Sequence, residues 1–408
     1  MAAGGGIVMP LPTMTPFLRK LLGMNWMLVL VMYGLLIFGL FMIESAARHL
    51  AVPEELKGKI SAGAYYAGMD KKWIAIGSVA FFAAAFVNYS WVRWLGLPVY
   101  LGGLVLMLIA MKQDNAVHQI RLGPLLFQPA QLGVASGILL ISWLLQDLPK
   151  LHRWFGAPFA RIAIIGIVSA VPFLVVMKMG DMGSALVWGP VAVVALLIGG
   201  VPFRYLSFMS FIGIGLIPLV YFVALPLVSK RGPERIDLWL NMLQGREVDT
   251  AGAGYAADKV TMAVGKAGWK GAGWNATAEK GSLHARKFIP WETAHNDFIF
   301  AVIAEELGFR GSLLLITAFA LLLIQCLFIA FYSRDMTGRL LVCLIVALFF
   351  AHIFENIGMC VLLLPITGIP LPLVSYSGTF VVICMFLLGL VQSVWIHRNQ
   401  HVAVAEEV

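Results

Sequence analysis

Residues 297–333 read DFIFAVIAEELGFRGSLLLITAFALLLIQCLFIAFYS, an apolar run that is longer than a membrane span and begins with an aspartate. The run predicts a membrane helix, since about 20 consecutive apolar residues cross a bilayer core. Three carboxylates, Asp297, Glu305 and Glu306, stand near its start in a chain that is only 12% charged. A carboxylate beside a span is costly unless it meets a partner, a cavity or a polar substrate. Asp297 is therefore the first candidate for chemistry.

The same apolar pattern recurs along the whole chain, which is 60% hydrophobic with a mean hydropathy of +0.88. These values favour an all-α polytopic membrane protein with about ten transmembrane helices and one large extracytoplasmic loop. The expected spans are 26–43, 72–89, 94–111, 129–146, 160–177, 183–200, 205–228, 298–333, 338–364 and 371–396.

The domain organisation follows from these spans. We expect a flexible tail at 1–18, helices over 19–228, a large loop over 229–296, helices over 297–396 and a tail at 397–408. The basic pair Arg19-Lys20 before the first run favours an uncleaved helix with a cytoplasmic N-terminus over a cleaved signal peptide. Lys and Arg number 10 on that side and 8 in the opposite short loops, so charge alone leaves the orientation open.

The net charge of +8 and the four cysteines limit the function. The basic residues lie in loops between apolar runs, which favours membrane lipid or a phosphorylated lipid substrate and argues against nucleic acid. Cys326, Cys343, Cys360 and Cys384 fall within or beside apolar runs without CxxC spacing, so neither a metal site nor a disulfide framework is predicted.

Two segments beside the spans are candidates for a binding site. The loop 229–296 holds aromatic anchors, and Tyr255 to Val264 is amphipathic enough to lie at a membrane surface. The stretch from Pro365 to Thr379 is too rich in proline and glycine for an ordinary helix. Such backbone at membrane depth lines a cavity or is buried in protein, although a simple turn between helices is an equal alternative.

A helix that begins near Asp297 would distribute the three acids around its axis. At about 100° per residue, Glu305 lies some 80° from Asp297 and can share its cavity, whereas Glu306 lies on the opposite face. Glu306 would then brace the helix, with Arg310 as a possible partner. The alternative for Asp297 itself is a partner of the helix dipole.

These stretches together resemble the SEDS family (shape, elongation, division and sporulation), whose RodA and FtsW members polymerise peptidoglycan from lipid II. Asp297-Phe-Ile-Phe-Ala followed by Glu305-Glu306-Leu-Gly resembles the family's TDFIFA…EELG signature. Pro365-Ile-Thr-Gly-Ile-Pro-Leu-Pro-Leu-Val-Ser-Tyr resembles its PxxGxPLPxxSYGG signature. Arg235 before Asp249-x-x-Gly252-x-Gly254-Tyr255, Gln128-Pro129 and Asp181-x-Gly183 are similar to further motifs.

The resemblance implies a glycosyltransferase in the bacterial inner membrane, with both termini cytoplasmic and the large loop periplasmic. Asp297 would be the general base for the acceptor GlcNAc 4-hydroxyl, with undecaprenyl pyrophosphate as leaving group. The residues implied to bind substrate are Arg235, Lys287, His295, Glu305, Tyr255, Asp181, Gln128 and Ser375. Those implied to be structural are Glu306, Pro365, Gly368, Pro370 and Pro372.

The resemblance further implies lipid II, an undecaprenyl-pyrophosphate-linked glycan and a class B penicillin-binding protein (a transpeptidase) as partners. The sequence offers no dedicated ligand cluster, so a divalent cation such as Mg²⁺ is implied only as a helper of the leaving pyrophosphate. A role in cell shape and elongation is favoured by Gly252-Ala-Gly-Tyr255. A lipid II flippase and an inactive scaffold of a cell-wall complex are the alternatives.

Several positions depart from the family pattern. Gln131 and Val134 stand where the family usually has a glutamate and a lysine, which indicates the paired loss of an acid and a base. Ser377 replaces a glycine of the SYGG motif, Gly180 a proline, His118-Gln119 an Arg-Trp pair and Lys259 a glutamine. We therefore expect a divergent or specialised member of the family.

Overall fold

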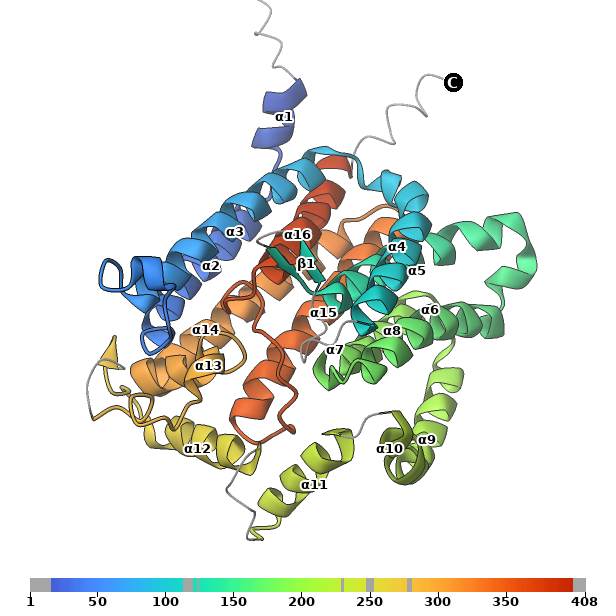
Figure 1. The fold of residues 1–408 in the computed structure, drawn as a ribbon. Helices are drawn as coiled ribbons and strands as arrows, with labels where there is room; N and C mark the ends of the chain where they lie inside the picture. The colour runs from blue at the N-terminus through green and yellow to red at the C-terminus, as the bar shows by residue number, and fades with distance from the viewer. Residues whose placement is uncertain are drawn as a thin grey trace, which may run out of the picture.

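The computed structural model describes residues 16–112, 120–122, 125–228, 231–246, 253–276 and 281–398. In this part of the chain, long helices form a bundle, and the first and last of them end at the same side of the molecule (Figure 1). The helices of the first half are α1 Pro16–Leu22, α2 Trp26–Ala46, α3 Ala62–Phe86, α4 Val92–Met111, α5 Pro129–Leu151, α6 Pro158–Lys178, α7 Met182–Leu186 and α8 Trp188–Ile198.

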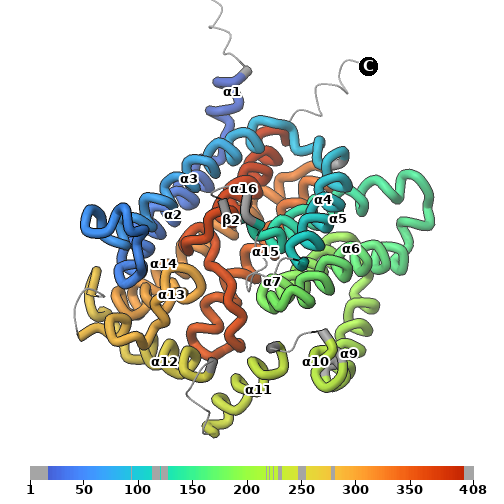
Figure 2. The backbone as a smooth tube through the Cα atoms, viewed as in Figure 1, coloured from blue at the N-terminus to red at the C-terminus, as the bar shows by residue number. Residues whose placement is uncertain are grey.

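The second half contains the helices of the large loop and the most buried spans. Figure 2 shows α11, α12 and α13 at the end of the bundle opposite to α1. The helices here are α9 Phe203–Leu219, α10 Leu225–Val228, α11 Arg231–Leu243, α12 Ala253–Lys266, α13 Trp291–Ala294, α14 Ile299–Phe331, α15 Met336–Cys360 and α16 Thr379–His397. Short helical turns lie at Glu54–Leu56, Tyr89–Trp91, Arg153–Gly156 and Val220–Ala224.

The core of the bundle is formed by α15, α16 and α5, and the other spans pack around them. Of the apolar window in each helix, 78% is buried in α15, 72% in α16 and 61% in α5. The α3 helix packs along α16, and α2 packs along α14. Polar caps start several helices: the Asn25 side chain accepts from Leu28 N–H, and the Asp335 side chain accepts from Gly338 N–H.

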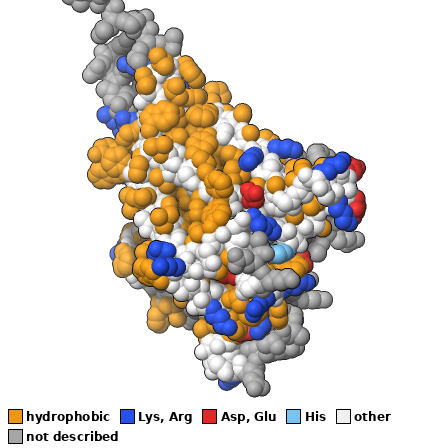
Figure 3. Space-filling model, turned by 90° about the vertical axis from the view of Figure 1, so that its left-hand side faces the viewer, with side chains coloured by type: hydrophobic (Ala, Val, Ile, Leu, Met, Phe, Trp, Pro, Cys, Tyr) orange, Lys and Arg blue, Asp and Glu red, His pale blue; other side chains and the backbone are white. Residues whose placement is uncertain are grey.

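The surface is that of a multi-pass membrane protein. Figure 3 shows a broad hydrophobic band, with Lys and Arg side chains gathered mainly outside it. Among the described residues, seven helices are long and apolar enough to cross a membrane. The bent pair Phe203–Leu216 and Tyr221–Leu227, with 42° between its halves, makes an eighth. The full set of ten crossings stays a prediction.

Several expected boundaries differ from the observed helices. The α3 helix starts at Ala62, ten residues before the expected span, and therefore also includes Asp70 and Lys71. The expected span 183–200 is divided into α7 and α8, and α16 starts at Thr379 instead of residue 371 because the chain before it is irregular. Part of the expected N-terminal tail is helical, since α1 starts at Pro16.

Two short strands precede α5. Strand β1, Ile120–Leu122, pairs antiparallel with β2, Leu125–Phe127, and Ile120 faces Phe127 across the pair. This hairpin leads into Gln128 at the start of α5. It is the only strand pair in the residues that the structure describes, so the fold is helical apart from this entry to α5.

The longest helix, α14, is interrupted near its N-terminal end. Gly308 has φ 67° and ψ −163°, a conformation that a side chain would strongly disfavour. The backbone N–H groups of Ala272 and Gly273 donate to the carbonyls of Glu305 and Glu306, at 2.8 and 2.9 Å. Beyond the break, Phe309 N–H donates to Gly268 O at 2.9 Å. A glycine-rich turn of the large loop thus satisfies the backbone groups that the break leaves free.

Candidate functional site

Asp297 lies in the turn between α13 and α14, where its backbone is fixed by a side chain from α15. The Nδ2 of Asn356 donates to the carbonyl of Asp297 at 2.8 Å and to the carbonyl of Ile369 at 2.7 Å. Asn356 is fully buried, while Asp297 is half-buried. One amide group therefore ties the start of α14 to the irregular segment that follows α15.

The irregular segment 361–378 packs directly against Asp297. Gly368 has φ +76°, and a Cβ at this position would lie 3.3 Å from Asp297 Oδ2. The Ser375 hydroxyl donates to Asn296 O at 2.6 Å and accepts from Leu371 N–H at 2.8 Å. The prediction that this segment is not an ordinary helix is confirmed. Its prolines, Pro365, Pro370 and Pro372, lie in this non-helical stretch.

The charges around Asp297 come from two other elements. Burial raises the pKa of Asp297 to about 7, the neighbouring Asp181 raises it as well, and Arg235 lowers it. Arg235 is on α11, and its Nη1 donates to Thr367 O at 3.1 Å. The large loop thus brings a guanidinium group to the segment that borders Asp297.

Asp181 joins the starts of α5 and α7. Its Oδ1 accepts from Ser184 N–H at 3.0 Å, and its Oδ2 accepts from Gln128 Nε2 at 3.2 Å. Gln131, at the position where the family usually has an acid, donates from Nε2 to the Ser184 hydroxyl at 3.1 Å. Gln128 and Asp181, distant in sequence, therefore belong to one polar network beside Asp297.

Glu355 of α15 was missed by the sequence analysis. It is buried, with 6% of its surface exposed, and a charge on it would be repelled by that of Asp181. It precedes Asn356, which holds the Asp297 backbone. A single acid within the apolar run of α15 is the signal that could have identified it, because such acids are rare in spans.

The two predicted glutamates of α14, Glu305 and Glu306, make their hydrogen bonds away from Asp297. The Glu305 carboxylate turns to the large loop, where it accepts from Leu283 N–H at 2.5 Å and His284 N–H at 3.1 Å. It borders a cavity of about 480 Å³ that Lys266 and Ser282 also line. Glu306 is fully buried and accepts a hydrogen bond from the Ser45 hydroxyl of α2. The structure thus uses both glutamates to join α14 to its neighbours.

Three more predicted residues lie among aromatic rings. The Lys287 ammonium is 4.5 Å from the centre of the Trp291 ring, and Lys259 is 5.8 Å from that of Tyr255. The His295 ring is 5.1 Å from Tyr66 and 5.3 Å from Tyr376, and burial lowers the pKa of His295 to about 4. His295 is therefore neutral near pH 7. The motif positions Asp249, Gly252, His118 and Gln119 lie outside the described residues.

This is a multi-pass helical membrane protein with a half-buried acid, an arginine and a second acid at one end of its bundle, and these groups are suited to acid–base chemistry. The profile of the FtsW/RodA/SpoVE family, described as cell cycle proteins, matches residues 25–400. The chain therefore belongs to this family, the SEDS family of membrane enzymes.

Named relatives and a solved structure agree with the family. The chain is 30% identical to peptidoglycan glycosyltransferase MrdB of Escherichia coli strain K12, over 72% of this chain and 76% of that protein. It is 27% identical to a probable peptidoglycan glycosyltransferase FtsW of Geobacter metallireducens, over 92% and 96%. A solved structure described as "Structural coordination of polymerization and crosslinking by a peptidoglycan synthase complex" matches with a TM-score of 0.72 at 22% identity, covering 92% of this chain and 99% of that one.

Proposed function

We propose that this protein polymerises lipid II into glycan strands, with Asp297 as the general base, in the synthesis of the wall that gives the cell its shape. The observation that carries the proposal is a half-buried carboxylate that Asn356 holds beside Arg235 and Asp181, in surroundings that raise its pKa to about 7. A catalytic base works best when its pKa is close to the working pH. The names of the relatives supply the reaction class.

In the proposed reaction, Asp297 accepts the proton of the 4-hydroxyl of a lipid II GlcNAc. The hydroxyl oxygen forms a bond to the anomeric carbon of the lipid-linked donor strand. The bond from that carbon to the pyrophosphate oxygen breaks, and undecaprenyl pyrophosphate leaves with the electron pair. General base assistance of this kind is worth about 10² to 10⁴ in rate.

The leaving pyrophosphate gains negative charge, and Arg235 is the cation that supports it in this proposal. Its fixed hydrogen bond to Thr367 O would hold the guanidinium in place before the reaction, which favours charge stabilisation. Lys287 is a second candidate on the same loop. Among the described residues, no group of three or more His, Cys, Asp or Glu side chains could hold a metal ion.

The proposal includes a location and a partner. The protein would lie in the bacterial inner membrane with cytoplasmic termini and its large loop, 229–296, on the periplasmic side. A class B penicillin-binding protein would crosslink the strands, in line with the solved peptidoglycan synthase complex that shares this fold and couples polymerization to crosslinking. The observation that α1 and the end of α16 lie opposite to α11–α13 supports this arrangement (Figure 1).

Polymerisation of lipid II by the purified full chain, with and without the transpeptidase, tests this function. We expect glycan polymer from the wild type and a loss of about 10² to 10⁴ in rate for Asp297→Asn. The amide keeps the shape of the side chain but cannot accept the proton. Lipid II translocation in liposomes without polymer, unaffected by Asp297→Asn, would support a flippase instead. Normal growth of a depleted strain on Asp297→Asn would support the scaffold.

The pH dependence follows from the pKa of Asp297. The base must be ionised, so the rate should rise with pH and level off above a midpoint near 7. An unperturbed aspartate would give a midpoint near 4. The measurement is the initial rate of polymerisation between pH 5 and 9 at saturating lipid II. A rate that is already constant at pH 5 would contradict the environment assigned to Asp297.

A further inference from the structure

The glycine-rich turn 267–276 of the large loop carries two tryptophans on the outside of the molecule. The Trp269 side chain is 60% exposed, and that of Trp274 is 50% exposed. Large exposed aromatic rings that adjoin other exposed apolar side chains mark an interaction site. The neighbours of these two rings therefore indicate what the turn contacts.

Each tryptophan packs against an exposed phenylalanine of a membrane helix. The Trp269 ring stacks on Phe309 of α14, with the ring centres 5.3 Å apart. The Trp274 ring meets Phe41 of α2 edge-on at 5.8 Å. Both helices are long and apolar enough to cross a membrane. The turn thus joins the outer surfaces of two membrane helices.

The two phenylalanines belong to exposed apolar stripes along their helices. Spacings of three, four and seven residues place the members of each stripe on one side of the helix. Within a span, an exposed apolar stripe is in contact with lipid acyl chains. The tryptophans extend these lipid-facing surfaces toward the large loop. The stripes are Leu30, Ile37 and Phe41 in α2 and Phe309, Leu313 and Ile316 in α14.

The level of Trp269 along α14 corresponds to a membrane–water interface. Tyr332, also exposed, lies at the opposite end of this helix. The helix from Phe309 to Tyr332 is about 35 Å long, slightly more than the hydrocarbon core of about 30 Å. Trp and Tyr gather at both interfaces of membrane proteins. The N–H of Arg310 donates to Trp269 O at 3.3 Å, which holds the turn at this level.

The charges of the turn suit the same position. Lys266 and Lys270 are exposed, and residues 267–276 contain no acidic side chain. At an interface, a lysine keeps its stem along apolar surface and extends its ammonium group to the lipid headgroups. Two cations beside two tryptophans therefore match a layer of phosphate groups that lies above acyl chains.

We propose that the turn 267–276 anchors the large loop in the phospholipid leaflet on its side of the membrane. Trp269 and Trp274 insert at the boundary between headgroups and acyl chains, and the two lysines bind headgroup phosphates. Because the turn is bonded to α14 on both sides of the break at Gly308, the anchor sets the depth of that break. This anchor does not depend on the glycosyltransferase reaction.

A nitroxide label beside the tryptophans tests this depth. Lys270→Cys carries the label while both tryptophans stay in place. Lys57→Cys is the matched control, because Lys57 lies in the charged loop before α3 and its side chain is 70% exposed. The four native cysteines are buried, so the label would attach to the introduced cysteine.

Each labelled full chain is placed in vesicles of phosphatidylethanolamine and phosphatidylglycerol. Electron paramagnetic resonance then compares collisions of the nitroxide with oxygen, which concentrates in the bilayer, and with a nickel chelate, which stays in water. We expect oxygen collisions to exceed chelate collisions at position 270 and the reverse at position 57.

Two double variants, made in the labelled Lys270→Cys protein, test the role of the rings. Trp269→Ala with Trp274→Ala should move the label toward water, with more chelate collisions and fewer oxygen collisions. Trp269→Tyr with Trp274→Tyr should keep the depth, because tyrosine also has an apolar ring with a polar end. Should the alanine variant fail to fold, the comparison of positions 270 and 57 still decides, since it leaves both tryptophans in place.

Three results would overturn the anchor. An excess of chelate collisions at position 270 would place the turn in water, and an unchanged depth in a folded double alanine variant would remove the tryptophans from it. A loss of oxygen collisions when the purified transpeptidase is added would assign this surface to a protein partner instead of lipid. These measurements need no polymerase activity, so a failure of the proposed function would leave their outcome unchanged.

Discussion

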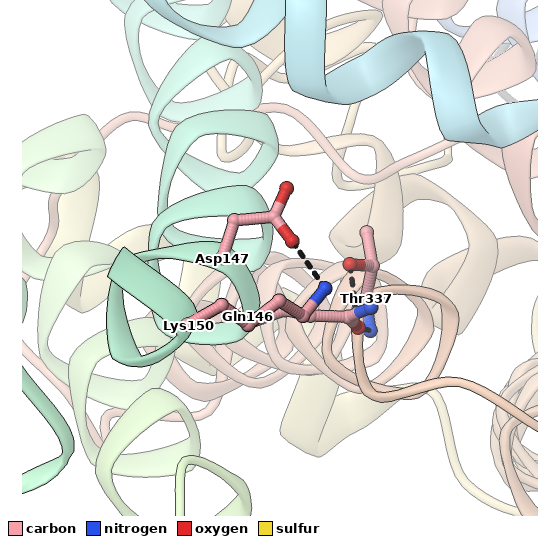
Figure 4. A network of polar contacts seen from close by, with 4 residues as sticks. All are labelled: Gln146, Asp147, Lys150 and Thr337. Carbon is pink, nitrogen blue, oxygen red and sulfur yellow. Dashed lines mark hydrogen bonds and ion pairs between the residues drawn. The ribbon is translucent and has the colours of Figure 1, made fainter. Parts of the chain in front are cut away.

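The two ends of α15 differ in whether their polar side chains have hydrogen-bond partners. The N-terminal end, at Thr337, is called the inner end, and the C-terminal end, at Asn356, the outer end. At the inner end, the Thr337 N–H and hydroxyl both donate to Gln146 Oε1 of α5, the hydroxyl at 2.7 Å, and Asp147 pairs with Lys150 at 2.6 Å (Figure 4). At the outer end, Glu355 Oε2 and the Asn356 Oδ1 are buried without hydrogen-bond partners among the described residues. Both ends belong to one helix in one bundle.

This difference suggests that the inner end of α15 contributes mainly to stability and the outer end mainly to activity. Satisfied polar groups at the inner end join α5 to α15 and specify their packing. Unsatisfied groups at the outer end reduce stability, and groups with such a cost are concentrated at functional sites. Mutations at the inner end should therefore change the folded fraction, and those at the outer end should change activity. The following predictions test this division.

The largest effect is expected for Gly308→Ala, at the break in α14. The new Cβ would overlap the backbone nitrogen of Gly271, in a backbone conformation that alanine disfavours. Strain and overpacking together predict a loss of about 2–5 kcal/mol in stability. Gly166→Ala, in α6 with no atom within 4 Å of the new Cβ, is the control. A thermal midpoint that falls equally in both variants would show that the break has no special role.

Arg235→Ala should reduce polymerisation by about 10²-fold with little change in thermal midpoint, because the cation proposed to support the leaving pyrophosphate is lost. The midpoint of the pH profile should also move upward, since Arg235 lowers the pKa of Asp297. The exposed Arg246 of the same loop provides a control through Arg246→Ala. A downward or unchanged pH midpoint would remove Arg235 from the surroundings of Asp297.

Gln146→Ala should reduce stability moderately and leave the activity of the folded protein unchanged. It leaves the buried Thr337 without its acceptor, which predicts a loss of about 1–3 kcal/mol in stability. The KM and kcat of the folded fraction should stay at wild-type values. Thermal unfolding and polymerisation are measured on the same preparation. A selective fall in kcat would mean that the inner end communicates with the site.

The smallest effect is expected for Lys150→Ala. Its ion pair with Asp147 is 2.6 Å long, but the lysine side chain is 64% exposed. Surface pairs of this kind contribute about 0–1 kcal/mol. The thermal midpoint and its dependence on salt should both stay close to wild type. A loss as large as that of Gln146→Ala would show that the inner network depends on this pair.

Much of the fold could be predicted from hydropathy, because the length of an apolar run decides whether it can cross a bilayer as a helix. The expected span 129–146 coincides closely with α5, and 160–177 with α6. The boundaries were least accurate where proline and glycine interrupt a run, as before α16. Hydropathy describes such a segment as apolar, but its backbone cannot form a continuous helix.

The site could be predicted in part. The motif that contains Asp297 and the segment that contains Gly368 lie together, as a shared site requires. The angle of about 80° between Asp297 and Glu305 assumed one helix from Asp297 onward, whereas α14 begins at Ile299. The Glu305 carboxylate instead receives N–H groups of the large loop. A helical wheel gives the direction in which a side chain points, but it does not identify which other element of the protein lies in that direction.

The break in α14 also has a consequence for how the enzyme meets the bilayer. The helix spans 33 residues, which is about 50 Å of helix, against a hydrocarbon thickness of about 30 Å. The part after Gly308, from Phe309 to Phe331, is about 35 Å long and is sufficient to cross it. In a thinner or thicker membrane this part would tilt by a different angle, and the change in angle would occur at Gly308. Asp297, on the other side of the break and held by Asn356 of α15, would keep its position while the lipid composition changes.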